Sequence, residues 1–208
     1  MTRRLFNMQI NTLHELRAIY AQPVARVLRK DIGCIDEHIG RFIGLSPFMV
    51  MSSGHSDGRL DASPRGGEPG FVKILDQHTL LIPDAAGNNR LDTLENILSN
   101  RQVGLLFMIP GVEEMVRVNG EATLRTDAPW IDRCTGDKRP PKLVIHVKVQ
   151  EAYLHCAKAV MRSHIWDQEA QIDRSRLPSM GEMMKAQLNL EGPPESREDM
   201  RKRYLPIL

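Results

Sequence analysis

The sequence lacks the short motifs that mark several large enzyme classes. It contains neither G-x-G-x-x-G nor G-x-x-x-x-G-K-[ST], the glycine-rich loops that bind dinucleotides and nucleoside triphosphates, and it has no H-E-x-x-H zinc motif. The seven histidines are scattered, so a metal site would need ligands from distant segments. These absences argue against an enzyme that depends on a dinucleotide or a nucleoside triphosphate, and against a metal site.

Cysteines, long apolar runs and excess charge are scarce as well. Cys34, Cys134 and Cys156 form no C-x-x-C pair, which argues against a disulfide framework and favours a reducing, cytoplasmic location. No stretch approaches the roughly 18 apolar residues of a membrane span. With 28 basic and 26 acidic residues the net charge is +2, so we expect neither a nucleic-acid nor a membrane partner.

What is present is a chain of 208 residues with helical patterns at both ends. We expect a single domain over residues 1–208, with a helical segment over 10–45 and a helical extension over 156–208. Short alternating runs that predict strands lie at 47–53, 59–66, 71–76, 78–84, 103–109, 115–126 and 142–154. Because most are joined by short turns, we expect a mainly β (α+β) fold built on a closed antiparallel barrel.

Two of these runs make specific predictions about burial. Residues 103–109 are apolar at every position, which predicts a strand buried on both faces. In residues 142–154 the alternation places Ile145, Val149 and Tyr153 on one buried side.

Two polar stretches, S-P-R-G at 63–66 and G-N-N-R at 87–90, combine residues that suit an anion. In a strand, Ser63 and Arg65 point to the same side, so a hydroxyl and a guanidinium can bind one anion. Gly66 lets backbone approach a ligand closely.

The second stretch precedes an expected helix. Gly87 allows a tight turn, and Asn88 or Asn89 can cap the helix. The first amides of the helix favour an anion, and Arg90 adds a full charge.

The same residues also have ordinary structural roles. An asparagine before a helix commonly serves only as a cap, and an arginine near a strand end commonly pairs with a carboxylate. Asp92 and Glu95 have the spacing of a capping pattern. Spacing alone leaves the choice between an anion site and a plain helix start open.

From Gly44 to Asp167 the sequence resembles the flavin mononucleotide (FMN)-binding split-barrel family related to pyridoxamine 5'-phosphate oxidase. Within it, a bacterial subgroup carries S-P-R-G, then P-D-x-x-G-N-N-R, then H-C-A-K-A-x-x-R-S-x-x-W-D, and this chain has all three in that order. The resemblance implies a six-stranded antiparallel split barrel with peripheral helices. It also implies a homodimer that holds FMN without a covalent bond at the subunit interface.

The resemblance implies roles for individual residues. Those that resemble phosphate contacts are Arg65, Asn88, Asn89 and Arg90. Those that resemble groups delivered by the partner subunit near the flavin ring or its substrate are Lys158, Arg162, Ser163 and Trp166. The second set is spaced along one helix, so a dimer-packing face is an equal alternative.

The chain departs from the family pattern in two places. Ala85-Ala86 stands where the subgroup often has Arg-Pro, which removes a possible cation and predicts weaker FMN affinity. Arg162-Ser163-His164 has the letters of the substrate-binding R-x-H of true pyridoxamine phosphate oxidases in a different context, so oxidation of that vitamin is not expected.

The resemblance thus predicts an FMN-dependent oxidoreductase acting on an unidentified small substrate. No catalytic residue can be assigned, because hydride acceptance belongs to the flavin. The alternatives are a flavin carrier or sensor, and a split barrel that binds haem or a deazaflavin.

Overall fold

The structure, a computed structural model, describes residues 9–84, 87–135 and 140–207. Ala85 and Ala86 lie outside the described residues, so their expected effect on FMN affinity stays a prediction.

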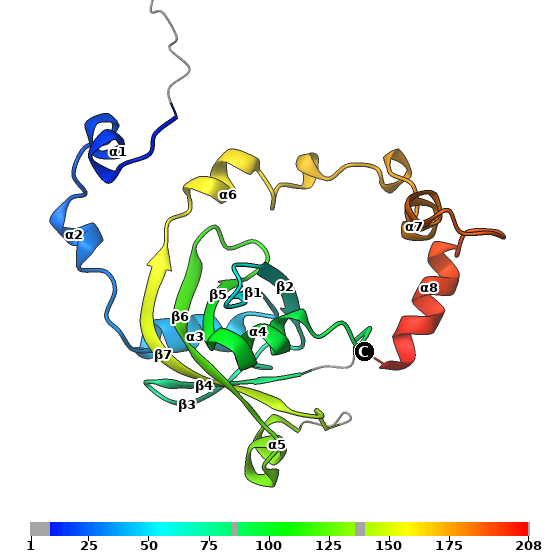
Figure 1. The fold of residues 1–208 in the computed structure, drawn as a ribbon, viewed down its shortest axis with the longest axis horizontal. Helices are drawn as coiled ribbons and strands as arrows, with labels where there is room; N and C mark the ends of the chain where they lie inside the picture. The colour runs from blue at the N-terminus through cyan, green and yellow to red at the C-terminus, as the bar shows by residue number, and fades with distance from the viewer. Residues whose placement is uncertain (1–8, 85–86, 136–139, 208) are drawn as a thin grey trace, which may run out of the picture.

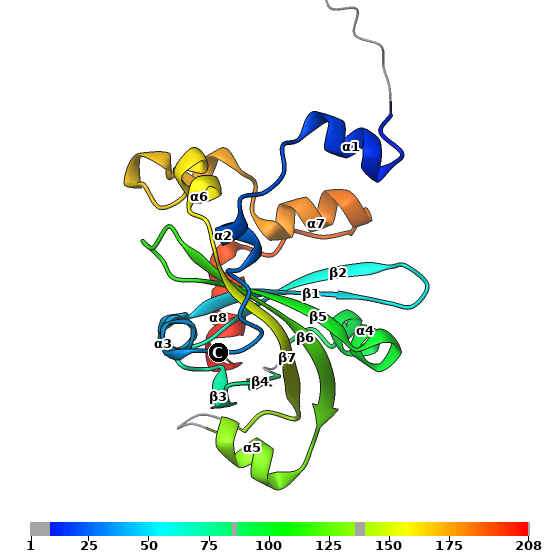
Figure 2. The same ribbon diagram turned by 90° about the vertical axis from the view of Figure 1, so that its left-hand side faces the viewer.

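Seven antiparallel strands form one sheet in the order β2-β1-β5-β6-β7-β4-β3 (Figures 1 and 2). The strands are β1 (Phe48–Gly54), β2 (Leu60–Gly66), β3 (Lys73–Asp76), β4 (Thr79–Pro83), β5 (Gln102–Met108), β6 (Met115–Arg125) and β7 (Val144–His155). The mainly β split barrel with peripheral helices is confirmed, but the sheet has seven strands where six were expected. The short β3 pairs with β4 at the edge of the sheet.

The core fills the space between the sheet and two helices, α3 (Glu37–Leu45) and α4 (Asp92–Asn100). The Asp36 carboxylate fixes the start of α3 by accepting a hydrogen bond from the Ile39 amide at 2.8 Å. The buried apolar residues that the two helices contribute are Ile39, Ile43, Leu94 and Ile97.

A β-bulge interrupts the pairing of β6 with β7. Asn119 pairs with Glu151, but Gly120 pairs with Val149, so Gln150 is an extra residue on β7. One extra residue moves every later side chain of the strand to the opposite face.

The bulge decides which residue at the end of β7 enters the core. Ala152 is buried and Tyr153 is only half-buried, so the expectation that Tyr153 shares the buried side with Val149 is wrong. Glycine at position 120 permits the bulge, because a Cβ there would lie 2.3 Å from the Lys148 backbone oxygen.

Strand β5 is buried on one face. Val103, Leu105 and Phe107 lie in the core, whereas Leu106 and Met108 are half-buried. The prediction that residues 103–109 are buried on both faces is therefore wrong, because the core covers one side of this strand.

Short helices surround the sheet and make up both ends of the chain (Figure 1). They are α1 (Leu13–Ile19), α2 (Ala25–Leu28), α5 (Ala128–Cys134), α6 (Lys158–Ser163), η1 (Gln168–Ala170), η2 (Arg174–Arg176), α7 (Met180–Leu188), α8 (Arg197–Tyr204) and η3 (Leu205–Ile207). Across the described ranges, no helix has the length and apolar character that a membrane crossing requires. The same residues contain no cluster of three or more histidine, cysteine or acidic side chains arranged to hold a metal ion.

Candidate functional site

The S-P-R-G stretch lies on β2, where side chains at alternate positions share a face. Asp61, Ser63 and Arg65 are half-buried on that face, and the residues between them are exposed. The strand thus presents a carboxylate, a hydroxyl and a guanidinium in one row.

Arg65 forms a shielded ion pair. Its Nη1 donates to Asp84 Oδ1 at 2.9 Å, and the two side chains are only 17% and 19% exposed. The Nε of Arg65 is buried without a hydrogen-bond partner among the described residues. A buried N–H without an acceptor costs free energy, so this edge of the guanidinium suits an anion from outside the chain.

The Ser63 hydroxyl belongs to a different contact. It lies 3.0 Å from both carboxylate oxygens of Asp61, and the Thr93 hydroxyl in the first turn of α4 donates to the same carboxylate. A serine has one hydroxyl hydrogen, so Ser63 cannot donate to an anion while it donates to Asp61. In this arrangement Asp61 joins β2 to α4, and Ser63 supports that carboxylate. The donors left for an anion are those of Arg65.

The G-N-N-R stretch makes a turn ahead of α4 that differs from the expected cap. The helix begins after Leu91 without a side-chain cap, so neither Asn88 nor Asn89 caps it. The Asn88 side-chain oxygen instead accepts from the Arg90 amide at 2.9 Å, and the left-handed φ of 60° falls at Asn89 rather than at Gly87. The asparagines shape the turn, and the first amides of α4 have no side-chain acceptor.

Arg90 lies at the surface beside this turn. Its side chain is 77% exposed and pairs with Asp92. The Asp92 carboxylate raises the pKa of Arg90 above its ordinary value, and Asp61 adds to the effect. The hydrogen bond between Thr93 and Asp61 places the first turn of α4, which directly follows this turn, against the polar face of β2.

Sequence reasoning missed the aspartates of this region. Asp61, Asp84 and Asp92 each contact a residue predicted to bind the phosphate or its neighbour. The position of Asp61, two before Ser63 in an alternating strand, was a usable signal. The contact between Arg65 and Asp84 joins β2 to the residue after β4, and these strands are not adjacent in the sheet, so no local pattern indicates it.

The third motif lies on α6 and the turn that follows it. Arg162 Nε donates to the Lys158 backbone oxygen at 3.0 Å, and Ser163 Oγ donates to the Val160 oxygen at 3.0 Å. Trp166 Nε1 donates at 2.9 Å to a backbone oxygen in the turn between β5 and β6. Lys158 and Arg162 are exposed and form no ion pair with the described residues, and within one chain no hydrogen bond joins this segment to Arg65 or Arg90.

The turn between β1 and β2 contains G-H-S-D-G at residues 54–58, the letters of a hydrolase nucleophile turn. Here the segment joins two antiparallel strands, whereas the hydrolase turn joins a strand to a helix. Ser56 Oγ accepts from Ser99 Oγ at 2.7 Å, and His55 lies 2.9 Å from Asp57. Since Ser56 has no hydrogen bond with His55 among the described contacts, the turn contains no nucleophile–base pair.

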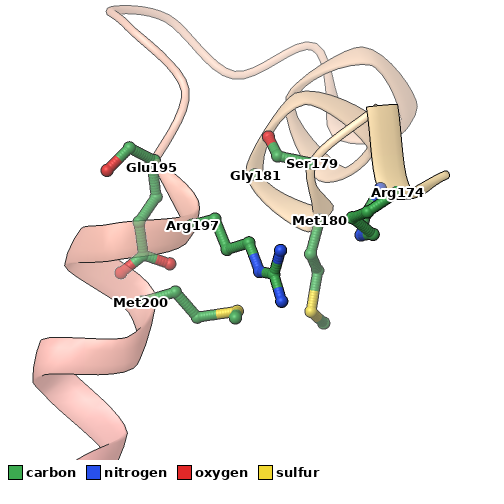
Figure 3. Close-up of a pocket in the computed structure, with 8 residues that line it drawn as sticks. Arg174, Ser179, Met180, Gly181, Glu195, Arg197 and Met200 are labelled. Atoms are coloured by element: carbon green, nitrogen blue, oxygen red, sulfur yellow. The ribbon is translucent and has the colours of Figure 1, made fainter. Parts of the chain in front are cut away.

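A pocket of about 90 Å³ lies in the C-terminal segment, between η2, α7 and α8 (Figure 3). Met180, Arg197 and Met200 line it, and none of the predicted site residues does. Ligand pockets generally enclose roughly 300 Å³ or more, so this one is too small for a flavin.

Residues 35–156 match the sequence pattern of the family described as pyridoxamine 5'-phosphate oxidase. The match covers more than half of the chain and includes every strand of the sheet. The chain belongs to the pyridoxamine 5'-phosphate oxidase family. A comparison with curated proteins gave no match.

Several solved structures resemble this chain at low sequence identity. HupZ from Group A Streptococcus has 15% identity and a TM-score of 0.48, over 58% of this chain and 93% of that one. An FMN-binding protein from Syntrophomonas wolfei has 12% identity and a TM-score of 0.44, over 63% and 87%. HutZ, a haem storage protein from Vibrio cholerae, has 11% identity and a TM-score of 0.39, over 56% and 89%.

Proposed function

We propose that this chain is an FMN-binding flavoprotein and an oxidoreductase for a small molecule. The observation that carries the proposal is the buried, unpartnered Nε of Arg65, next to the ion pair with Asp84. A phosphate supplies the missing acceptor, and a guanidinium edge binds phosphate through two parallel hydrogen bonds. Family membership supports a flavin as the molecule that carries the phosphate.

The second cation of the proposed phosphate site is Arg90. Its contact with Asp92 is an exposed ion pair, which contributes little to stability, so the guanidinium can turn toward a ligand at small cost. The turn at Asn88 and Asn89 and the uncapped amides of α4 supply further donors. Gly66, the last residue of β2, belongs to the proposed site through its backbone, which directly follows Arg65.

We further propose that the flavin lies between two copies of the chain. In this arrangement the partner subunit supplies Lys158, Arg162, Ser163 and Trp166 near the ring or its substrate. The lack of contact between α6 and the phosphate residues of the same chain supports delivery across an interface. The two exposed cations of α6 are available for that role because described acidic side chains do not neutralise them.

When bound, the flavin supplies hydride acceptance, and the chain supplies binding, orientation and exclusion of water. The exposed cations of α6, together with Trp166 in the segment after that helix, favour an oxidoreductase over a carrier, because a carrier needs no groups at the substrate face. A cytoplasmic location follows from the cysteine usage and stays a prediction.

The visible spectrum of the purified protein tests the proposal. We expect the two absorption bands of oxidised flavin, and mass analysis of the cofactor released by acid should identify FMN. A haem Soret band, a deazaflavin, or riboflavin without phosphate as the released cofactor would contradict the proposal. Loss of the flavin bands on adding a reduced nicotinamide nucleotide would support the oxidoreductase role.

A further inference from the structure

The two ends of the chain expose an unusual amount of apolar side chain. We name residues 9–33 the N-terminal arm and residues 156–207 the C-terminal arm. Of the 26 exposed large hydrophobic side chains in the described residues, 19 lie on these arms. None of the residues of α1, α2, α7 and α8 is buried.

On each arm these side chains form a stripe on a helix. In α1 they are Leu13, Leu16 and Ile19, and in α7 they recur at spacings of three and four. The apolar residues of α7 and its end are Met180, Met183, Met184, Leu188 and Leu190. A helix in water keeps such a stripe only when another surface covers it.

The solvent-accessible surface of the chain is larger than that of a typical folded monomer of the same mass. A monomer of 23.6 kDa exposes about 9,800 Å² according to the scaling of surface with mass. This chain exposes 15524 Å², more than half as much again. Stable homodimers bury roughly 2,000 to 5,000 Å² in total, so the surplus is sufficient for a large subunit interface.

Polar contacts attach each arm to the barrel, although the apolar stripes of both arms are exposed. Lys30 Nζ donates to a backbone oxygen of β7 at 3.2 Å, and the Asp31 carboxylate accepts from a backbone amide of β7 at 3.0 Å. Trp166 anchors the C-terminal arm to the turn between β5 and β6. In both views α1, α6 and α7 lie on the same side of the barrel (Figures 1 and 2).

We propose that the N-terminal and C-terminal arms clasp a second copy of this chain, each covering apolar surface of the partner. A second copy fits because the barrel also carries bare apolar side chains, such as Leu60 and Leu98, which the partner's arms can cover under two-fold symmetry. The inference rests on the dimer of the proposed function. It goes beyond that function by assigning the subunit interface to the arms. Since α6 is part of the C-terminal arm, this interface brings α6 to the partner.

The experiment is sedimentation of the full chain in wild-type form and as the double variant Leu16→Glu/Ile19→Glu. We expect a wild-type dimer and a dimer dissociation constant at least about 100-fold higher for the variant, because two charges enter the apolar interface on each chain. Ala18→Glu, on the opposite face of α1, is the matched control and should leave the constant unchanged. A second variant, Met183→Glu/Leu188→Glu, tests the C-terminal arm in the same way.

The substituted residues lie on α1 and α7, which bury no residue, so the variants should keep the melting behaviour of the barrel in circular dichroism. A wild-type monomer at micromolar concentration would overturn both the dimer and this inference. A wild-type dimer that both arm variants retain at full affinity would overturn the inference alone. If the arm variants dissociate but the wild-type dimer binds no FMN, the inference holds and the proposed function fails.

Discussion

At the scale of single residues, both arginines of the proposed phosphate site already have an aspartate partner. Arg65 pairs with Asp84 in a shielded position, and Arg90 pairs with Asp92 at the surface. A guanidinium has five N–H donors, so Arg65 can keep Asp84 and still bind a phosphate through Nε. The aspartate therefore holds the guanidinium in place as well as neutralising it.

Replacing Arg65 by alanine should have two separable effects. FMN affinity should fall by about 1.5 to 3 kcal/mol, the usual contribution of hydrogen bonds to charged groups. The apoprotein should also lose about 1 to 3 kcal/mol of unfolding free energy, because Asp84 loses its partner. Denaturant unfolding and FMN titration measure the two effects.

Asp84→Asn supplies the control. In that background Arg65→Ala should cost less stability, because no buried carboxylate is left unpaired, while the loss of FMN affinity persists. If the double variant regains wild-type FMN affinity, Arg65 acts on the fold and does not bind the phosphate.

Arg90→Ala should weaken FMN binding several-fold and leave the melting temperature of the apoprotein unchanged, because its side chain is exposed. The matched control is Arg59→Ala, an exposed arginine in the turn between β1 and β2 that also pairs with an aspartate, Asp57. FMN titrations of the two variants should differ, and equal affinities would show that Arg90 is only a surface residue.

The pH dependence of FMN binding follows from the charges of the arginine and of the phosphate that it binds. The pKa of Arg90 is raised by Asp92, so this arginine stays charged through neutral pH. A phosphate monoester gains its second negative charge above about pH 6. FMN affinity should be greatest above that pH and should fall as the pH is lowered from 8 to 5, whereas riboflavin affinity should not follow this curve in the same titration series.

At the scale of secondary-structure elements, alternating polarity was enough to predict most strands. Residues 115–126 alternate cleanly and form β6, and Ser63 and Arg65 share a face of β2. The bulge in β7 was not predictable from alternation, because Gln150 fits the polar pattern and the extra residue shows only in the pairing with β6. The asparagine cap failed for a similar reason, since a cap and an Asx turn need the same residue types.

Gly120 should be required for the bulge. Gly120→Ala places a Cβ against a backbone oxygen, which cannot rotate away, so unfolding free energy should fall by about 1 to 3 kcal/mol. Gly87→Ala, where a Cβ meets nothing within 4 Å, is the control and should leave the stability of the apoprotein unchanged. A Gly120→Ala protein as stable as the control would show that the strands pair without the bulge.

Substitutions at Trp166, in the segment after α6, distinguish a role in catalysis from a role in packing. If the partner's flavin lies near it, Trp166→Ala should slow reduction or reoxidation per bound flavin while occupancy stays near that of the wild type. Trp166→Phe, which keeps an aromatic ring and loses the hydrogen bond to the Val112 oxygen, should retain most of the rate. A fall in occupancy alone would assign the tryptophan to packing.

At the scale of the whole molecule, the barrel is well packed and the arms are not. Short-range patterns predicted helices at both ends, and helices are present there, but periodicity cannot tell which surface an apolar stripe contacts. The same limit applies to Arg65 of the candidate site, because its partner Asp84 lies 19 residues further along the chain. Both gaps concern contacts between segments far apart in the chain.

The most direct test of the central claim is a titration of the apoprotein with FMN and, in parallel, with riboflavin. The two ligands share the ring and differ in the phosphate, so the ratio of their dissociation constants isolates the contribution of Arg65 and Arg90. We expect FMN to bind at least about tenfold more tightly, with Arg65→Ala removing most of that difference and leaving riboflavin affinity unchanged. Equal affinities for the two ligands, or no binding of either, would contradict the proposed phosphate site.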